Sequence, residues 1–240
     1  MAFKQIRVSP IMDLDAYADN DVLFPLTEIQ LPSQTGACKI TAITVVNRAE
    51  TGVNDWDMRL LFLNDNSQEL GTVNATAGTL TYNNARQSVV ANVILSSKNG
   101  ADTDDFDNFS IASSSNHASS SNYGIAPILV EPKSGSRSVW FSAISNGDTP
   151  TYAGATGVLV NNVSNYGADS STTIIVDTVD ATLHFKAGDT VVDADDVVIG
   201  VVESVTANLI TLTTNNIGAL TNNDELFTPH QLEFIFDIEY

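Results

Sequence analysis

The sequence predicts an all-β protein: an antiparallel, jelly-roll-like β-sandwich with an inserted small β-barrel module and at most one or two short helices. The composition is the first observation, because only 16% of residues are charged and 43% are hydrophobic, with much Asn, Ser, Thr and Val. The second is the alternation of β-branched runs with short polar breaks. The third is an acidic stretch of very short apolar runs that precedes a long terminal strand.

The N-terminal part predicts an arm followed by strands. Pro25 and Pro32 limit helix, so residues 12–32 (MDLDAYADNDVLFPLTEIQLP) predict an extended arm, a loop and a short edge strand. Residues 37–47 (ACKITAITVVN) and 58–63 (MRLLFL) predict half-buried strands, and NDNS at 64–67 predicts a closing turn. We expect these two strands to lie side by side.

A short helix and a polar segment are predicted next. Asn83 and Asn84 precede ARQSVV as N-cap residues precede a helix, and residues 91–95 return to strand. Residues 96–122 hold few large apolar groups, and their tract ASSSNHASSSN predicts an exposed loop. Strands are predicted again at 128–130 and 138–144.

Residues 157–228 predict a separate module of about seventy residues, a size that suits a small barrel. Its predicted strands are VLVNNV, TTIIVD, ATLHF, DTVVD, VVIGVVESV and NLITLT. The alternating QLEFIFDIEY then predicts a terminal strand, and we expect residues 138–144 to be its neighbour. The predicted domains are therefore 1–156 plus 229–240, a sandwich with an N-terminal arm, and 157–228, an inserted acidic barrel.

The net charge of −19 opposes binding to nucleic-acid phosphates. Ten acids against one base, Lys186, give residues 157–228 a charge of −9, so we expect this module to stay in solvent. Nine of the ten bases precede residue 138. We expect the larger domain to meet an acidic partner through bases that include Lys4, Arg7, Lys39, Arg48 and Arg59.

No apolar run approaches the roughly 18 residues of a membrane-spanning helix, and MAFKQIRVSP lacks the apolar core of a signal peptide. We therefore expect no membrane partner. Cys38 predicts a small buried thiol, because no partner base is indicated for a thiolate. No nucleophile or phosphate-loop motif is present, so we expect no enzyme.

Acidic loops raise the question of a metal. From Asp193, an EF-hand calcium loop would need Gly at its sixth and Glu at its twelfth position, where Val198 and Ser204 stand, so DADD predicts a hairpin turn. His117 and the two later histidines lack zinc-site spacing. We expect no cofactor, although structural calcium is an alternative to a solvated loop at two clusters, Asp13/Asp15/Asp19/Asp21 and Asp102/Asp104/Asp105/Asp107.

Aromatic side chains offer a possible sugar-stacking platform. Its members would be Trp56, Tyr123, Trp140 and Tyr152. Trp140 within VWF is better explained as core, whereas Trp56 between two aspartates has the setting of an exposed residue. Trp56 is therefore the predicted glycan contact.

Several stretches together resemble a family of small structural proteins of tailed bacteriophages, including marine ones. They are AYADNDVLFPLTEIQLP, ITAITVVNRAETGVNDWDMRLLFLND, LGTVNATAGTL, NNARQSVVANVIL, SVWFSAISNGDTPTYAGAT and LEFIFDIEY. The resemblance covers roughly residues 14–156 and 230–240, while 157–228 looks like an accessory module of virion proteins.

This resemblance implies a capsid decoration or cement protein on the surface of the virion. Its partner would be the major capsid protein, whose lattice it would bind and stabilise without a reactive residue. Repeated attachment points on a shell favour a homo-oligomer, a dimer or a trimer. The alternative is a tail-fibre or head-fibre component that binds host surface glycans; a third reading, a polysaccharide depolymerase, has no motif in its favour.

Overall fold

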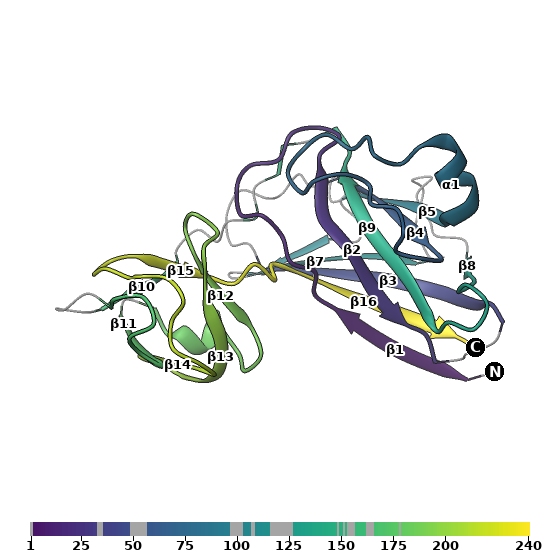
Figure 1. Ribbon diagram of the computed structural model, residues 1–240. Coiled ribbons are helices and arrows are strands. Elements are labelled where there is room, and N and C mark those ends of the chain that lie inside the picture. Colours follow the sequence, from purple (N-terminus) through teal and green to yellow (C-terminus); the bar gives the residue numbers. More distant parts are fainter. Residues whose placement is uncertain are drawn as a thin grey trace. The chain divides into compact units, whose positions relative to one another are not determined.

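The computed structural model describes most of the chain (Figure 1). The described residues are 2–32, 36–48, 57–96, 103–106, 109–115, 127–147, 149–150, 152, 157–161, 166–177 and 179–240. The chain divides into two compact units, Met1–Tyr152 with Gln231–Tyr240, which we call the sandwich, and Ala153–His230, which we call the barrel. The described elements are antiparallel strands with one α-helix and one 3₁₀-helix, so the predicted fold class is confirmed.

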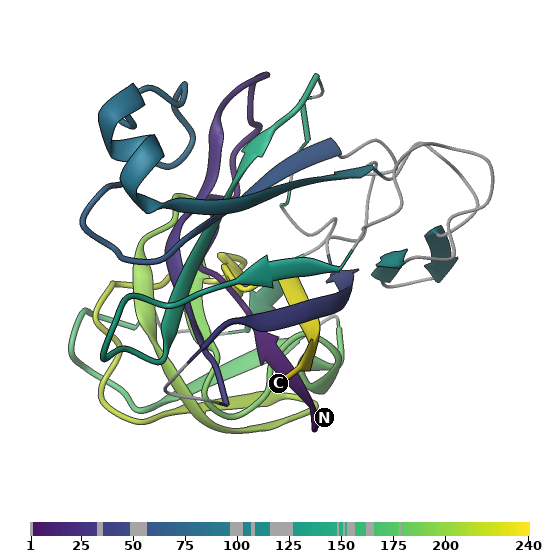
Figure 2. The same cartoon turned by 90° about the vertical axis from the view of Figure 1, so that its right-hand side faces the viewer.

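The first sheet of the sandwich has six strands. Its order is β1 (Phe3–Val8), β16 (Leu232–Glu239), β3 (Cys38–Asn47), β7 (Phe109–Ser115) and β6 (Thr103–Phe106), and β8 (Ile128–Val130) pairs with the start of β3. Because β1 and β16 are neighbours, the two chain ends meet (Figures 1 and 2). There the N–H groups of Ala2 and Tyr240 each donate to the other residue's carbonyl at 3.0 Å.

The second sheet has four strands. Its order is β2 (Val22–Gln30), β9 (Ser138–Ser145), β4 (Asp57–Leu63) and β5 (Val89–Ser96). The helix α1 (Tyr82–Ser88) leads directly into β5. Its N-cap is Thr81, whose hydroxyl accepts the Asn84 N–H at 3.4 Å, so the predicted helix is present but begins earlier than Asn83 and Asn84 suggested.

Five fully buried phenylalanines join the two sheets. Phe141 on β9 lies at the centre of the group, with its ring 5.1 Å from Phe234 and 5.1 Å from Phe236 on β16. Phe24 on β2 and Phe62 on β4 contact the same group. Edge-to-face contacts of this kind add to the free energy of burying the rings, so this group is the main anchor of the sandwich.

Two predictions of which strands lie side by side are wrong. β16 pairs with β1 and β3, and β9 faces it across the core instead of lying beside it. β3 and β4 likewise lie in different sheets. Alternation shows that one face of a strand is buried, but it does not show whether the contacting strand lies in the same sheet or the opposite one.

The prediction of an exposed loop at residues 96–122 is also wrong in part. β7 runs through Phe109–Ser115 and pairs with Ala42–Asn47 of β3, and β6 pairs with β7. The ladder bonds come from the backbone, so a strand rich in small polar side chains still pairs. The remainder of the tract, residues 116–122, lies outside the described residues.

The barrel is closed by six short strands. Their order is β10 (Val158–Val160), β11 (Thr173–Asp177), β14 (Leu209–Leu212), β13 (Val198–Thr206), β12 (Thr190–Asp193) and β15 (Glu225–Phe227). The first and last strands pair, with Val158 opposite Leu226, so the two ends of the inserted module lie together. The core is aliphatic apart from Phe185.

Two predictions within the barrel have different outcomes. The hairpin turn at DADD is confirmed, because β12 pairs with β13 and the Asp193 carboxylate accepts the N–H groups of Asp195 at 3.0 Å and Val197 at 2.9 Å. The predicted strand ATLHF is wrong, since its first residues form a 3₁₀-helix, Ala181–Leu183, capped by Asp180.

Candidate docking surface

The outer face of the six-stranded sheet carries a row of acids along β16. The buried residues of this strand alternate with half-buried ones, as a half-buried strand requires. The acids on the outward side are Glu233, Asp237 and Glu239. Gln5 on β1 donates its side-chain amide to Asp237 at 3.1 Å. Two adjacent strands, β16 and β1, therefore present polar groups on this face.

Two bases flank this row of acids. Arg7 on β1 places Nη1 3.3 Å from Oε1 of Glu233, and Lys39 on β3 places Nζ 3.6 Å from Oε1 of Glu239. The side chains of the bases are 56% and 48% exposed, which makes the pairs weak, about 0–1 kcal/mol each. These two pairs therefore contribute little to the stability of the sandwich.

The structure does not gather the five predicted docking bases into one patch. Arg7 and Lys39 share the outer face of the six-stranded sheet. Lys4 lies on the opposite face of β1 from Arg7, because the two are three residues apart on a strand. Arg59 is exposed on β4 of the other sheet, and Arg48 follows the end of β3.

The aromatic platform is not assembled among the described residues. Trp56 and Tyr123 lie outside them. Trp140 is half-buried on the outer side of β9 while Val139 and Phe141 fill the core, so its predicted place in the core is wrong. Tyr152 is fully buried and therefore not open to a sugar.

Tyr152 belongs to an internal tyrosine pair. Its ring meets that of Tyr17 edge-on at 5.7 Å, and burial raises the pKa of Tyr152 above its ordinary value. The Tyr17 hydroxyl lies 2.9 Å from the carbonyl of Leu23 and 2.9 Å from the N–H of Asp13. The pair therefore anchors the loop between β1 and β2 to the core.

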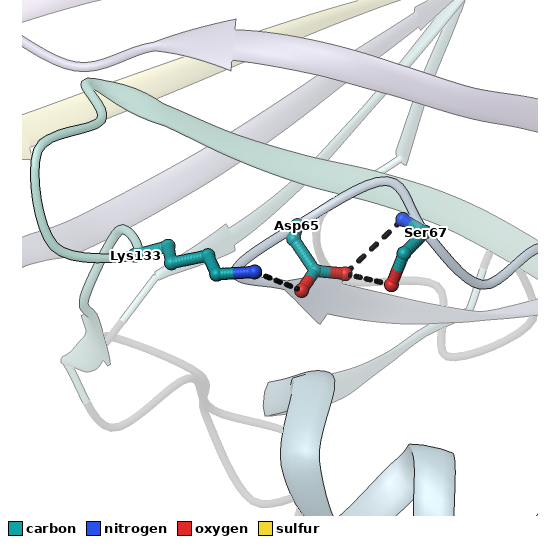
Figure 3. Close-up of polar contacts among 3 residues, drawn as sticks. All are labelled: Asp65, Ser67 and Lys133. Atoms are coloured by element: carbon teal, nitrogen blue, oxygen red, sulfur yellow. Dashed lines mark hydrogen bonds and ion pairs between the residues drawn. The ribbon is translucent and has the colours of Figure 1, made fainter.

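A second charged cluster joins two loops of the sandwich (Figure 3). The Asp65 carboxylate accepts the Ser67 hydroxyl at 2.6 Å and the Ser67 N–H at 3.1 Å, and it pairs with Lys133 Nζ at 3.3 Å. These contacts, the Ser67 hydroxyl first, hold the pKa of Asp65 below its ordinary value. The cluster ties the turn after β4 to the loop between β8 and β9.

The first acidic loop uses its carboxylates internally. Asp13 accepts the N–H two residues later at 2.8 Å, and Asp21, which is buried, accepts the N–H of Ala18 at 2.7 Å. Asp19 accepts the Gly147 N–H at 2.6 Å. Among the described residues no group of three or more His, Cys, Asp or Glu side chains is placed to hold a metal ion.

The second acidic cluster and the histidines are described only in part. Asp104 and Asp105 lie on β6, while Asp102, Asp107 and His117 lie outside the described residues. His184 ends the 3₁₀-helix of the barrel. None of the helices in the described part of the chain is long and apolar enough to cross a membrane.

The barrel's aspartates close its turns. Asp189 accepts the Lys186 N–H at 3.0 Å, and Asp224 accepts both the N–H and the hydroxyl of Thr221 at 2.7 Å. Asp180 accepts the N–H and hydroxyl of Thr182, which lower the pKa of Asp180. Part of the charge of −9 therefore comes from aspartates that close the turns of this module.

The acids and the amide that accompany Arg7 and Lys39 were not predicted from the sequence. The signal was present in QLEFIFDIEY, where Glu233, Asp237 and Glu239 occupy the side of the strand that the apolar residues leave free. Gln5 had no such signal, because its position opposite Asp237 depends on β1 pairing with the far end of the chain.

Comparisons with known proteins leave the family open. No known family matches the chain, and no curated protein sequence matches it. A solved structure described as PNGF-II in a C2 space group aligns with 98% of this chain at 7% identity and a TM-score of 0.19. The alignment spans 64% of that structure's length, and a likeness at this score supports no statement about fold or function.

Proposed function

We propose that this chain is a structural protein of a tailed-bacteriophage particle that decorates the head by binding the major capsid protein. The observation that carries the proposal is the outer face of the six-stranded sheet, where the exposed bases Arg7 and Lys39 pair weakly with half-buried acids of β16, on three adjacent strands. A rigid face with charges of both signs suits binding by complementarity over a broad area.

The resemblance to phage structural proteins falls on the same unit. It covers roughly residues 14–156 and 230–240, and β16 within the second range carries the acids of this face. The docking role therefore belongs to the sandwich.

The barrel has a different part in the proposal. Several of its aspartates already accept hydrogen bonds within its own turns, and its net charge of −9 favours contact with water over contact with an acidic shell. On a crowded particle surface this charge would keep neighbouring particles apart. The barrel is thus the unit that stays in solvent.

Docking would proceed by exchange of ion pairs. Arg7 and Lys39 leave their glutamates on β16 and meet carboxylates of the capsid lattice, while the freed glutamates meet bases of the lattice. Because the two bases are exposed and their ion pairs are weak, exchange loses little, and the complementary potentials raise the association rate and fix the orientation.

The test is binding of the purified full chain to empty shells of its phage prepared without it. The double variant Arg7→Ala/Lys39→Ala should bind about tenfold more weakly or worse, because two docking charges are lost. The control Arg86→Ala removes an exposed base on α1 and should bind like the wild type. Equal binding of all three proteins, or no binding to shells, would contradict the proposal.

Copy number in purified particles gives an independent check. Decoration of a repeating lattice predicts hundreds of copies per particle, of order the number of lattice positions. A few copies would instead indicate a fibre component.

A further inference from the structure

The outer edge of β1 is an open edge of the six-stranded sheet. β1 pairs with β16 on one side, and among the described residues no strand pairs with its other side. Ala2 and Tyr240 exchange both backbone hydrogen bonds, and such pairs alternate along an antiparallel ladder. The N–H and C=O groups of Phe3, Gln5 and Arg7 therefore point away from β16, into the open edge.

This edge lacks most of the devices that prevent strand addition. Its pairing with β16 is regular over all six residues, without a bulge or a proline. β2, an edge strand of the other sheet, contains Pro25 and two register shifts, both of which hinder the addition of a further strand. Phe3 is 70% exposed on β1, which leaves a large aromatic group in water.

We propose that a second copy of this chain pairs its own β1 antiparallel with this edge, with Gln5 of both copies on the twofold axis. In this register Phe3 faces Arg7 of the other copy, Lys4 faces Ile6, and Ala2 faces Val8. The residues whose N–H and C=O groups point into the open edge then face each other across the two copies. The outward faces of the two sheets lie on the same side. A twofold contact of this kind closes on itself and yields a dimer.

The charge of Lys4 and the length of the paired segment favour one of the possible registers. Registers that differ by one residue would set the outward face of one sheet against the inward face of the other. A shift of two residues in one direction places Lys4 opposite Lys4, which like-charge repulsion disfavours. A shift of two residues in the other direction would pair fewer residues of the two β1 strands. The Gln5-centred register is the longest one without opposed like charges.

The contact is small but specific. It offers roughly six backbone hydrogen bonds and two contacts in which an Arg7 guanidinium covers a Phe3 ring. Two chains of net charge −19 repel each other, so association should strengthen as salt screens the charge. The dimer is therefore expected at high protein concentration, the condition of a crowded shell. The inference does not depend on the proposed function.

Sedimentation of the full chain between about 10 µM and about 1 mM tests the dimer. Gln5→Pro removes the side chain and, from the backbone, an N–H that points away from β16, and the loss of two intermolecular hydrogen bonds should weaken the dimer about tenfold or more. Gln5→Ala loses the same side chain, including its bond to Asp237, and should dimerise within about threefold of the wild type. A monomer at the highest concentration, or equal dimerisation of both variants, would overturn the proposal.

Cysteine scanning tests the register. Facing Gln5 positions would lie about 5.5 Å apart between Cα atoms, within the range of a disulfide. Oxidation of Gln5→Cys should give a covalent dimer, whereas Phe3→Cys and Arg7→Cys, roughly 14 Å from their equivalents, should not. The native Cys38 is 1% exposed, so the wild type serves as background. A covalent dimer with Phe3→Cys and none with Gln5→Cys would refute this register.

Discussion

The sandwich and the barrel differ in what they bury. The sandwich has five phenylalanine rings at its centre, contributed by β2, β4, β9 and β16. The described core cluster of the barrel consists of Val, Ile, Leu and Ala side chains, with Phe185 as its only buried ring. Large rings fill the space between two facing sheets, whereas a small closed barrel has room only for compact side chains.

They also differ in how they use carboxylates. On the outer face of the sandwich, Glu233 and Glu239 pair with Arg7 and Lys39, bases far away in the sequence. In the barrel, Asp189 and Asp224 accept N–H groups only three residues away. The surface of the sandwich therefore depends on its strand order, and the turns of the barrel depend on local sequence.

The two units can be monitored separately. Both tryptophans, Trp56 and Trp140, precede residue 153, so tryptophan fluorescence reports on the sandwich alone. Amide hydrogen exchange of residues 166–220 reports on the barrel. Variants in one unit should therefore change one signal and leave the other unchanged.

The largest expected effect is that of Phe141→Ala on the sandwich. Removing the central ring leaves a cavity among four other phenylalanines and should lower the free energy of unfolding by about 3–5 kcal/mol. Denaturant titration followed by tryptophan fluorescence measures the loss. Ile144→Ala, half-buried on the outer side of the same strand, should lose only about 1 kcal/mol. Equal losses would show that the aromatic group is not the anchor.

An intermediate effect is expected from Asn216→Ala in the barrel. The buried Asn216 side chain accepts the N–H groups of Ser170 and Ser171 and donates to the carbonyls of Gly167 and Gly218. Its loss leaves these groups unsatisfied and should destabilise the barrel by about 2–3 kcal/mol.

Hydrogen exchange of residues 166–220 measures this loss against a matched control. Asn215→Ala removes a single exposed bond, to the Asp169 carbonyl, and should change stability by less than about 1 kcal/mol. Tryptophan fluorescence should not change in either variant. A shift of the fluorescence transition in Asn216→Ala would mean that the units unfold together.

The smallest expected effect concerns Asp65, a turn aspartate of the sandwich that also pairs with a distant base. Its pKa is lowered on folding, so its contribution to stability is full above its ordinary value of 3.8 and disappears as pH falls through the folded pKa. Asp65→Asn should therefore be less stable than the wild type by less than about 1 kcal/mol at neutral pH, with no difference in strong acid.

Titration of Asp65 by NMR separates its two partners. Ser67→Ala should raise the pKa of Asp65 more than Lys133→Ala does, because the Ser67 hydroxyl is the largest cause of the shift. A larger rise of the Asp65 pKa in Lys133→Ala than in Ser67→Ala would make the ion pair with the distant base the dominant contact. Asp65 would then resemble Glu233 and Glu239, whose partners are also far away in the sequence.

Local features of the fold were predictable from the sequence. The apolar alternation of 232–239, the buried Cys38 and the DADD turn all follow from short stretches whose physics needs no distant contact. The inserted barrel was predictable for a similar reason, because turn residues recur every few positions through that segment.

Only the tertiary structure decided which strands meet. The sequence determined that β16 has one buried face, but the placement of β16 between β1 and β3 depends on backbone ladders between segments more than two hundred residues apart in the case of β1. The same ladders bring Arg7 to Glu233 and leave one edge of β1 open. Hydrogen bonds between backbones are nearly independent of side-chain identity, so strand order leaves little trace in the sequence, whereas burial and turn formation act through the side chains themselves.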